Sequence, residues 1–111
     1  MKISIDLTLD SAHQLHLEGD SKCNNLHGHR YEIHVEIVDY HEERDIVVNF
    51  HEIKKFFDMY DHVFLNDVVP FETTIENMVR HWAGTIKDMF DVSKVTIVGK
   101  ETENCLAEYT T

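Results

Sequence analysis

The sequence predicts an α+β fold: a four-stranded antiparallel sheet with two helices on one face, in the chain order ββααββ. Two observations lead to this prediction. Segments near both ends alternate apolar and polar residues with the two-residue period of a strand, whereas two central segments repeat apolar residues at helical spacing. The chain has 111 residues, of which 42% are hydrophobic, enough for one compact core. We therefore expect a single domain over residues 1–111.

The first two strands are predicted from strict alternation. Apolar side chains occupy every odd position from Ile3 to Leu9 and again from Tyr31 to Ile37, with polar residues between them. Side chains two apart on a strand share a face, so each strand should bury one face. The loop that connects the strands contains turn-forming residues, which favours an antiparallel pair: Gly19, Asp20, Asn24 and Asn25.

Two amphipathic helices are expected in the middle of the chain. Asn49 is a good N-cap, and apolar residues follow it at helical spacing: Ile53, Phe56, Phe57 and Tyr60. Pro70 interrupts the next segment, after which Thr73 or Thr74 can cap a second helix. An apolar stripe from Ile75 to Phe90 predicts this second helix most clearly.

The last two strands complete the predicted sheet. Val95, Ile97 and the residues on to Glu101 indicate a third strand, and Leu106 to Tyr109 indicate a short fourth one. A small antiparallel sheet of this kind has two open edges. Open edges are often paired between subunits, so we expect a homo-oligomer.

Charge and composition exclude several classes of partner. Ten basic residues against 21 acidic ones give a formal net charge of -11, which opposes binding to nucleic acid or to an anionic membrane. No apolar run reaches the roughly 20 residues that span a bilayer, and we expect a soluble, cytoplasmic protein. Cys23 and Cys105 have no spacing typical of a disulfide framework or a zinc ribbon.

Three histidines are the strongest candidates for a metal site. If the first strand continues to His13, its imidazole shares the buried face, and His27 and His29 share the face of Tyr31. Three imidazoles with an open fourth position are typical of catalytic zinc. The alternative is that these histidines pack at the end of the sheet or cap turns.

Four further residues are candidates for proton transfer or ligand binding. Cys23 lies four residues before His27, and a nearby cation would enlarge its thiolate fraction; the alternative is an inert cysteine. An acid beside a histidine, as in Asp61 and His62, can tune an imidazole, although adjacent side chains rarely hydrogen-bond each other squarely. The alternative for Asp61 and His62 is that they form a solvent-exposed helix C-terminus without a chemical role. Glu101 by itself is an ordinary exposed acid.

Five motifs in order resemble the 6-pyruvoyl-tetrahydropterin synthase family, and the match runs almost end to end. They are Ser11-Ala12-His13, Cys23 separated by three residues from His27-Gly28-His29, Asp61-His62 with Leu65-Asn66, Thr74 with Glu76-Asn77, and Lys100-Glu101-Thr102. The chain departs from the family at two places. Asn49-Phe50 stands where relatives usually have Asp-Phe, and Thr73-Thr74 where they often have Pro-Thr.

The resemblance implies the tunnelling fold, in which subunits form a barrel, usually a hexamer of two trimers. It implies that zinc is held by three histidines (His13, His27 and His29), that Cys23 is the general base, and that Asp61 and His62 form the partner relay. Glu101 would anchor a pterin, with Thr74 and Glu76 shaping the pocket. A carboxylate suits that role because the pterin edge presents two donors side by side.

The activity implied is that of a 6-carboxytetrahydropterin synthase of the queuosine pathway, which acts on 7,8-dihydroneopterin triphosphate. The small size and the C-x3-HGH spacing favour this activity. One alternative is a sister enzyme that makes 6-pyruvoyltetrahydropterin, and another is a non-catalytic pterin-binding or zinc-stabilised assembly module. Because the protein is acidic, a triphosphate requires a local basic patch, for which Lys22, Arg30 and Lys100 are candidates.

Overall fold

The computed structural model describes residues 1–19 and 21–111, so Asp20 of the predicted loop lies outside the described residues. The elements in order are β1 (Lys2–His13), η1 (Lys22–Asn24), β2 (His27–Val38), α1 (Phe50–Asp58), α2 (Leu65–Val68), α3 (Ile75–Phe90), β3 (Lys94–Thr102) and β4 (Cys105–Thr110). The four predicted strands and two predicted helices are confirmed. The short elements η1 and α2 are additional, because one turn is too short to show a helical period in the sequence.

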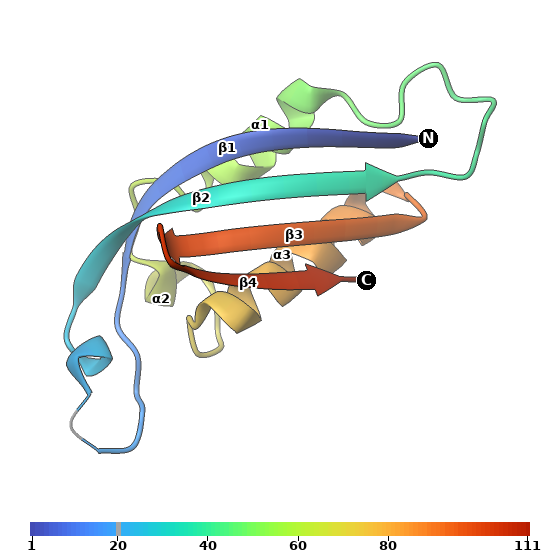
Figure 1. Cartoon of the computed structure of the whole chain (residues 1–111). Helices are drawn as coiled ribbons and strands as arrows, with labels where there is room; N and C mark the ends of the chain where they lie inside the picture. Colours follow the sequence, from blue (N-terminus) through green and yellow to red (C-terminus); the bar gives the residue numbers. More distant parts are fainter. Residues whose placement is uncertain (20) are drawn as a thin grey trace.

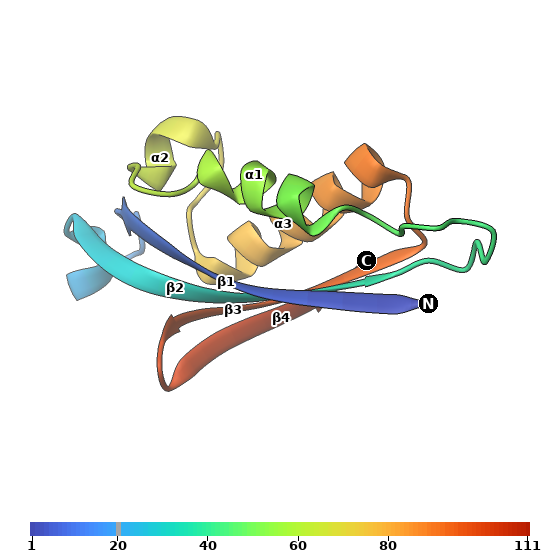
Figure 2. The same cartoon turned by 90° about the horizontal axis from the view of Figure 1, so that it is seen from above.

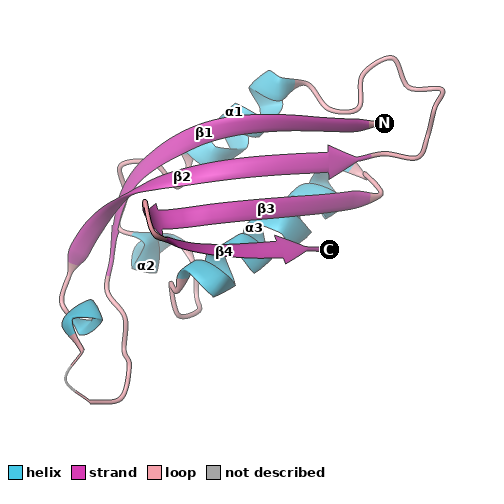
Figure 3. Ribbon diagram, viewed as in Figure 1, coloured by secondary structure: helices cyan, strands magenta, loops and turns pink. Residues whose placement is uncertain are grey.

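The four strands form one antiparallel sheet in the order β1-β2-β3-β4. Both helices that the sequence predicts, together with α2, cover the same face of this sheet (Figures 1 and 2). The chain ends lie at one end of the sheet, and η1 lies at the other (Figure 3). Within the described residues, no helix is long and apolar enough to cross a bilayer.

The core lies between the sheet and the helices. Because side chains alternate along a strand, β2 and β3 each bury every second residue, and α1 and α3 bury the stripe that faces the sheet. Trp82 is the largest fully buried side chain, and its ring meets Phe57 edge to face at 5.4 Å between centroids. The core therefore joins α1 and α3 to the sheet that carries the site.

Gly99 allows α3 to pack closely on β3. A Cβ atom there would lie 2.8 Å from both Ile75 Cδ1 and Val79 Cγ1, whereas a Cβ atom at Gly84 would meet nothing within 4 Å. We expect Gly99→Ala to lower the free energy of unfolding by about 1–3 kcal/mol through overpacking. Gly84→Ala should raise it by up to about 1 kcal/mol, because alanine favours a helix. Urea unfolding of both variants checks the prediction, and equal effects would contradict it.

Both predicted helices begin with a side-chain N-cap, at Asn49 and at Thr74. Asn49 Oδ1 accepts a hydrogen bond from the His51 amide at 2.9 Å and begins α1. Thr74 Oγ1 accepts one from the Asn77 amide at 3.2 Å and begins α3. Each cap satisfies an amide that the first helical turn leaves free.

The face of the sheet turned away from the helices carries charged side chains. His34 Nδ1 lies 2.6 Å from Asp6 Oδ1, and His34 Nε2 lies 3.3 Å from Glu36 Oε1. The hydrogen bond to Asp6 raises the pKa of His34, and Glu36 adds to this increase. Protonated His34 is therefore stabilised by folding.

This ion pair predicts a small, pH-dependent contribution to stability. The contribution is fully present below the unfolded pKa of about 6.5 and is lost as the pH rises through the higher folded pKa. Because the His34 side chain is 36% exposed, solvent screening should keep the contribution below about 1 kcal/mol. We expect the stability difference between the wild type and His34→Gln to be larger at pH 6 than at pH 8.5. A difference that grows toward pH 8.5 would contradict this.

Candidate functional site

The three predicted histidines meet at one end of the sheet. In the β1–β2 register His13 lies opposite His27, and Ser11 lies opposite His29. The ring centroid of His13 is 4.5 Å from that of His27 and 5.1 Å from that of His29, and the other two rings are 4.9 Å apart. One nitrogen from each ring lies within 4.8 Å of the other two, so the rings can share one ion.

Backbone carbonyls orient two of these rings. Nδ1 of His13 lies 2.7 Å from the carbonyl oxygen of Thr73, and Nδ1 of His27 lies 2.7 Å from that of Asn25. A carbonyl only accepts, so both Nδ1 atoms carry a hydrogen, and in a neutral ring the Nε2 atom then holds a free lone pair. These Nε2 atoms are 2.9 Å apart. Two facing lone pairs repel unless a proton or a cation lies between them.

Two of the three histidines, His13 and His29, favour the neutral form, which suits them to bind a cation. Burial lowers the pKa of His13, which is only 1% exposed. Burial also lowers the pKa of His29, and the neighbouring rings of His13 and His27 add to the effect. Metal ligands must be deprotonated, so the lowered pKa values of His13 and His29 favour the form of these two rings that can bind a metal.

The set of donors fits zinc. Imidazole is a preferred zinc ligand, and nitrogens bound to one tetrahedral zinc at about 2.0–2.1 Å lie about 3.3 Å from each other. The 2.9 Å between the two Nε2 atoms therefore needs only a small opening. Within the described residues, no carboxylate or thiol joins this group of ligand atoms. Three protein ligands leave a fourth position for water or substrate.

Asp61 and His62 form a close pair, although adjacent side chains rarely hydrogen-bond each other squarely. His62 Nδ1 lies 2.9 Å from Asp61 Oδ2, and His62 has a left-handed backbone with φ of 56°. Asp61 Oδ1 accepts a hydrogen bond from the Asp10 amide at 2.9 Å. This amide lowers the pKa of Asp61, and His62 lowers it further. The ionised carboxylate is therefore available to orient the exposed imidazole of His62.

The segment after α1 is held along β1, which places this pair beside the histidines. The amide of His62 donates to the carbonyl of Asp10 at 2.6 Å, and the amide of Ala12 donates to that of Val63 at 3.0 Å. His29 and His62 line the same open hollow, of about 550 Å³, together with Gly28. An added Cβ atom at Gly28 would make only an ordinary contact, 3.6 Å from the Ser11 carbonyl.

The predicted pterin-binding residues lie near the histidines. Glu101 is at the end of β3, where burial raises its pKa; the carboxylate of Glu76 raises it further, and His27 opposes the increase. The hydroxyl of Tyr31 is buried without a hydrogen-bond partner among the described residues, and burial raises its pKa. Thr74 is at the start of α3, two residues before Glu76.

Cys23 lies on η1, in the loop between β1 and β2. Its side chain is exposed, and its backbone carbonyl accepts a hydrogen bond from the Leu15 amide at 3.0 Å. The structure thus brings the three histidines together and leaves the thiol outside that group of ligand atoms. Cys105, on β4, is also an exposed free cysteine.

The three basic residues considered for a phosphate patch do not form one cluster. Arg30 is paired with Asp10, with Nε 2.9 Å from Oδ1 and an Nη atom 3.2 Å from Oδ2. Lys100 lies opposite Glu32, on the face of the sheet away from the helices, and Lys22 lies on η1. A triphosphate would therefore have to compete with Asp10 for Arg30.

Several residues that shape the site carry no signal in the sequence. The carbonyls of Thr73 and Asn25 orient the histidines, but every residue has a carbonyl. The backbone amide of Asp10 donates a hydrogen bond to Asp61, and the sequence does not predict this contact either. Thr73 directly precedes the N-cap of α3, and this position is the one feature of the sequence that marks it.

Comparison with known sequences matches almost the whole chain to one family. The model of the family described as 6-pyruvoyl tetrahydropterin synthase matches residues 2–111. The 6-carboxy-5,6,7,8-tetrahydropterin synthase of Haemophilus influenzae is 31% identical over 139 aligned positions, which cover 97% of each chain.

Solved structures share the fold. The 6-pyruvoyl tetrahydropterin synthase of Caenorhabditis elegans superposes with a TM-score of 0.71 at 26% identity, covering all of this chain and 95% of its own. The Plasmodium vivax 6-pyruvoyl tetrahydropterin synthase has a TM-score of 0.73 at 13% identity, covering all of this chain and 98% of its own. The second likeness, at this low identity, concerns the fold alone.

Proposed function

Because the chain belongs to the 6-pyruvoyl tetrahydropterin synthase family, we propose that it is a zinc-dependent 6-carboxy-5,6,7,8-tetrahydropterin synthase. It would convert 7,8-dihydroneopterin triphosphate and water to 6-carboxytetrahydropterin, acetaldehyde and triphosphate, a step of queuosine biosynthesis. One observation carries the metal-dependent part of this proposal: the Nε2 atoms of His13 and His27 face each other at 2.9 Å, beside His29, while the Nδ1 atom of each ring contacts a backbone carbonyl. The name of the Haemophilus relative supports the choice of product.

His13, His27 and His29 would hold the zinc ion through their free ring nitrogens. When bound, zinc supplies a Lewis acid that stabilises negative charge on the side-chain oxygens of the substrate. The carbonyls of Thr73 and Asn25 keep two of the rings in the tautomer that binds a metal. The chain therefore supplies both the ligands and their orientation.

Proton transfer would be divided between Cys23 and the Asp61–His62 pair. Cys23 is the proposed base that removes a carbon-bound proton, and its exposed position on η1 leaves it accessible to a substrate. His62 shares its hollow with His29, and ionised Asp61 stabilises the imidazolium that forms when His62 accepts a proton. Two proton carriers suit a reaction that moves protons between neighbouring carbons.

Glu101 would recognise the pterin ring. The 2-amino and N3–H groups of a pterin present two donors that one carboxylate can accept together. Those donors would also offset the repulsion that Glu101 experiences from Glu76. The Thr74 oxygen already accepts a hydrogen bond as the cap of α3, and its own hydrogen remains available for the ligand.

We also propose that copies associate through the strands at the sheet edges. β1 and β4 are the outer strands of the sheet, and the segment at His62 and Val63 makes backbone hydrogen bonds with β1 near its end, at Asp10 and Ala12. The part of the β1 edge that precedes these contacts favours pairing with another copy. A hexamer made of two trimers is the expected assembly, and a stable monomer in light scattering at micromolar concentration would contradict it.

Product identification tests the proposed reaction. Zinc-loaded protein is incubated with 7,8-dihydroneopterin triphosphate, and the products are analysed by mass spectrometry. The proposal expects 6-carboxytetrahydropterin and acetaldehyde in equal amounts. Release of 6-pyruvoyltetrahydropterin would instead identify the sister activity, and binding of the pterin without turnover would identify a non-catalytic module.

A further inference from the structure

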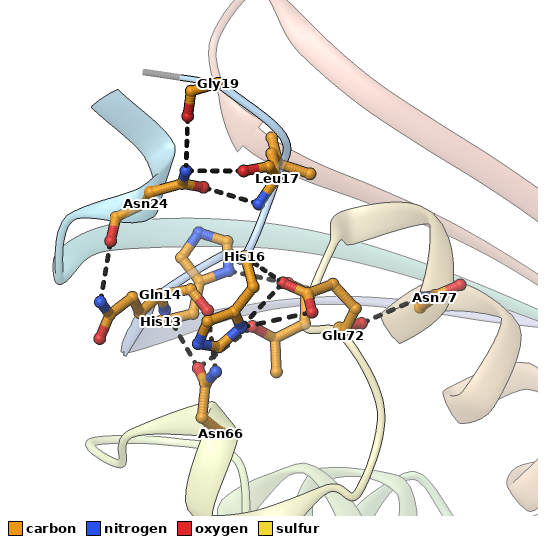
Figure 4. A network of polar contacts seen from close by, with 10 residues as sticks. His13, Gln14, His16, Leu17, Gly19, Asn24, Asn66, Glu72 and Asn77 are labelled. Atoms are coloured by element: carbon orange, nitrogen blue, oxygen red, sulfur yellow. Dashed lines mark hydrogen bonds and ion pairs between the residues drawn. The ribbon is translucent and has the colours of Figure 1, made fainter. Parts of the chain in front are cut away.

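A network of polar contacts connects the three segments that surround the histidines (Figure 4). The first segment comprises α2 and the residues that lead from it to α3, the second follows His13, and the third is the turn at η1 that carries Cys23. Three side-chain amides connect these segments, and they belong to Asn66, Gln14 and Asn24. Each contributes contacts that a hydrophobic or charged side chain could not reproduce.

Asn66 fixes the backbone directly after His13. Its Oδ1 accepts from the Gln14 amide at 3.0 Å, and its Nδ2 donates to the Gln14 carbonyl at 2.8 Å. The same Oδ1 accepts from Thr73 Oγ1 at 3.2 Å, and the Thr73 carbonyl holds the ring of His13. Gln14 is therefore anchored at both of its backbone groups, next to a proposed metal ligand.

The side chain of Gln14 extends this anchor to the η1 turn. Its Nε2 donates to the carbonyl of Asn24 at 2.8 Å. One residue further along, the amide of Leu15 donates to the carbonyl of Cys23 at 3.0 Å. Two successive residues of the His13 segment thus hold two successive carbonyls of the turn that carries the thiol.

The side chain of Asn24 binds the backbone of the loop between β1 and η1. Its Oδ1 accepts from the Leu17 amide at 2.8 Å, and its Nδ2 donates to the carbonyls of Leu17 at 2.9 Å and Gly19 at 3.2 Å. A side-chain amide can donate and accept at once, whereas a carboxylate would place its charge against these two carbonyls. The amide is also uncharged at every pH at which the protein is folded.

We infer that Gln14 and Asn24, anchored by Asn66, are positioning residues that set the Cys23 thiol relative to the histidine cluster. The inference rests on the proposed function, because it assigns a purpose to contacts around the proposed base. The chain needs such a device because Cys23 lies on a turn of only three residues with no buried side chain to hold it. Polar contacts therefore hold this turn in place, as buried apolar side chains hold the larger elements of the fold.

The test uses two variants in a Cys105→Ser background, so that Cys23 is the one thiol. Gln14→Leu removes the Nε2 donor but keeps the size and the backbone contacts of the residue, and Asn24→Ala removes the clamp on Leu17. Asn49→Ala is the matched control: it also removes an asparagine side-chain hydrogen bond, at the cap of α1, and should cost about 1 kcal/mol of stability.

The first readout needs no substrate. A cation near the thiol increases the thiolate fraction, so saturating zinc should accelerate alkylation of Cys23 by iodoacetamide about threefold or more in the parent protein and in Asn49→Ala. In Gln14→Leu and Asn24→Ala we expect the acceleration to fall below about 1.5-fold. A full zinc response in both variants, or none in the parent, would overturn the inference.

The second readout is turnover, measured as kcat and KM separately. Misplacing the base should lower kcat about tenfold in both variants, with KM unchanged within about twofold, because the pterin contacts lie elsewhere. An unchanged kcat would overturn the positioning role. If the parent protein makes no product while its zinc response depends on Gln14 and Asn24, the proposed reaction fails and the inference about the turn stands.

Discussion

Replacing His29 by alanine should abolish zinc binding under ordinary assay conditions and reduce turnover at least about 10³-fold. His29 is the preferred position because, unlike His13 and His27, its ring makes no hydrogen bond to a backbone carbonyl among the described residues. Its loss therefore removes a ligand with little effect on the fold. A loss of several kcal/mol of transition-state stabilisation corresponds to a factor of this size.

Metal analysis and steady-state kinetics measure the effect. We expect the zinc affinity of His29→Ala to fall at least about 100-fold while its circular dichroism spectrum stays that of the wild type. His51→Ala is the matched control, since His51 is exposed on α1 and away from the cluster. A His29→Ala protein that retains one zinc ion per chain would refute the three-histidine site.

Replacing Cys23 by alanine should lower kcat by about 10²–10⁴-fold and leave zinc content unchanged. The factor is that expected for loss of a general base. Zinc should remain because, among the described residues, the cluster of ligand atoms contains the three histidines without the thiol. The exposed side chain also makes this substitution nearly neutral for stability.

A control variant and two alternative outcomes show what this experiment can distinguish. Cys105→Ala, which removes the other exposed thiol, should keep full activity. If Cys23→Ala loses zinc together with activity, the thiol is a fourth metal ligand and the site is structural rather than catalytic. If Cys23→Ala turns over at the wild-type rate, the thiol is not the base and His62 becomes the principal candidate.

The sheet and the convergence of the histidines follow from residue spacing. Alternation along β1 and β2 puts His13, His27 and His29 on the buried face, and an antiparallel register then brings them together. The caps at Asn49 and Thr74 are equally readable, because short polar side chains before an apolar stripe have one common structural use. These features depend on neighbours within a few residues or on the simple period of a strand.

The four-residue helix α2 and the three-residue η1 could not be predicted, since a single turn shows no period. The local geometry of the Asp61–His62 pair could not be predicted from the sequence either. It accompanies the left-handed backbone of His62 and the hydrogen bonds that tie this turn to Asp10, 51 residues away in sequence from Asp61. A positive φ is uncommon for any residue other than glycine, so the sequence does not predict it, and the hydrogen bonds to β1 help to hold it.

The sequence alone indicated the side chains for which we propose chemical roles, because strand parity and motif order are local properties of the chain. Only the tertiary structure decided how they are held. The ring of His13 is oriented by a carbonyl 60 residues away, and the Cys23 turn is attached through Gln14 and Asn24. Backbone groups are the same in every residue, so their partners are chosen by the packing of the whole fold rather than by any local pattern.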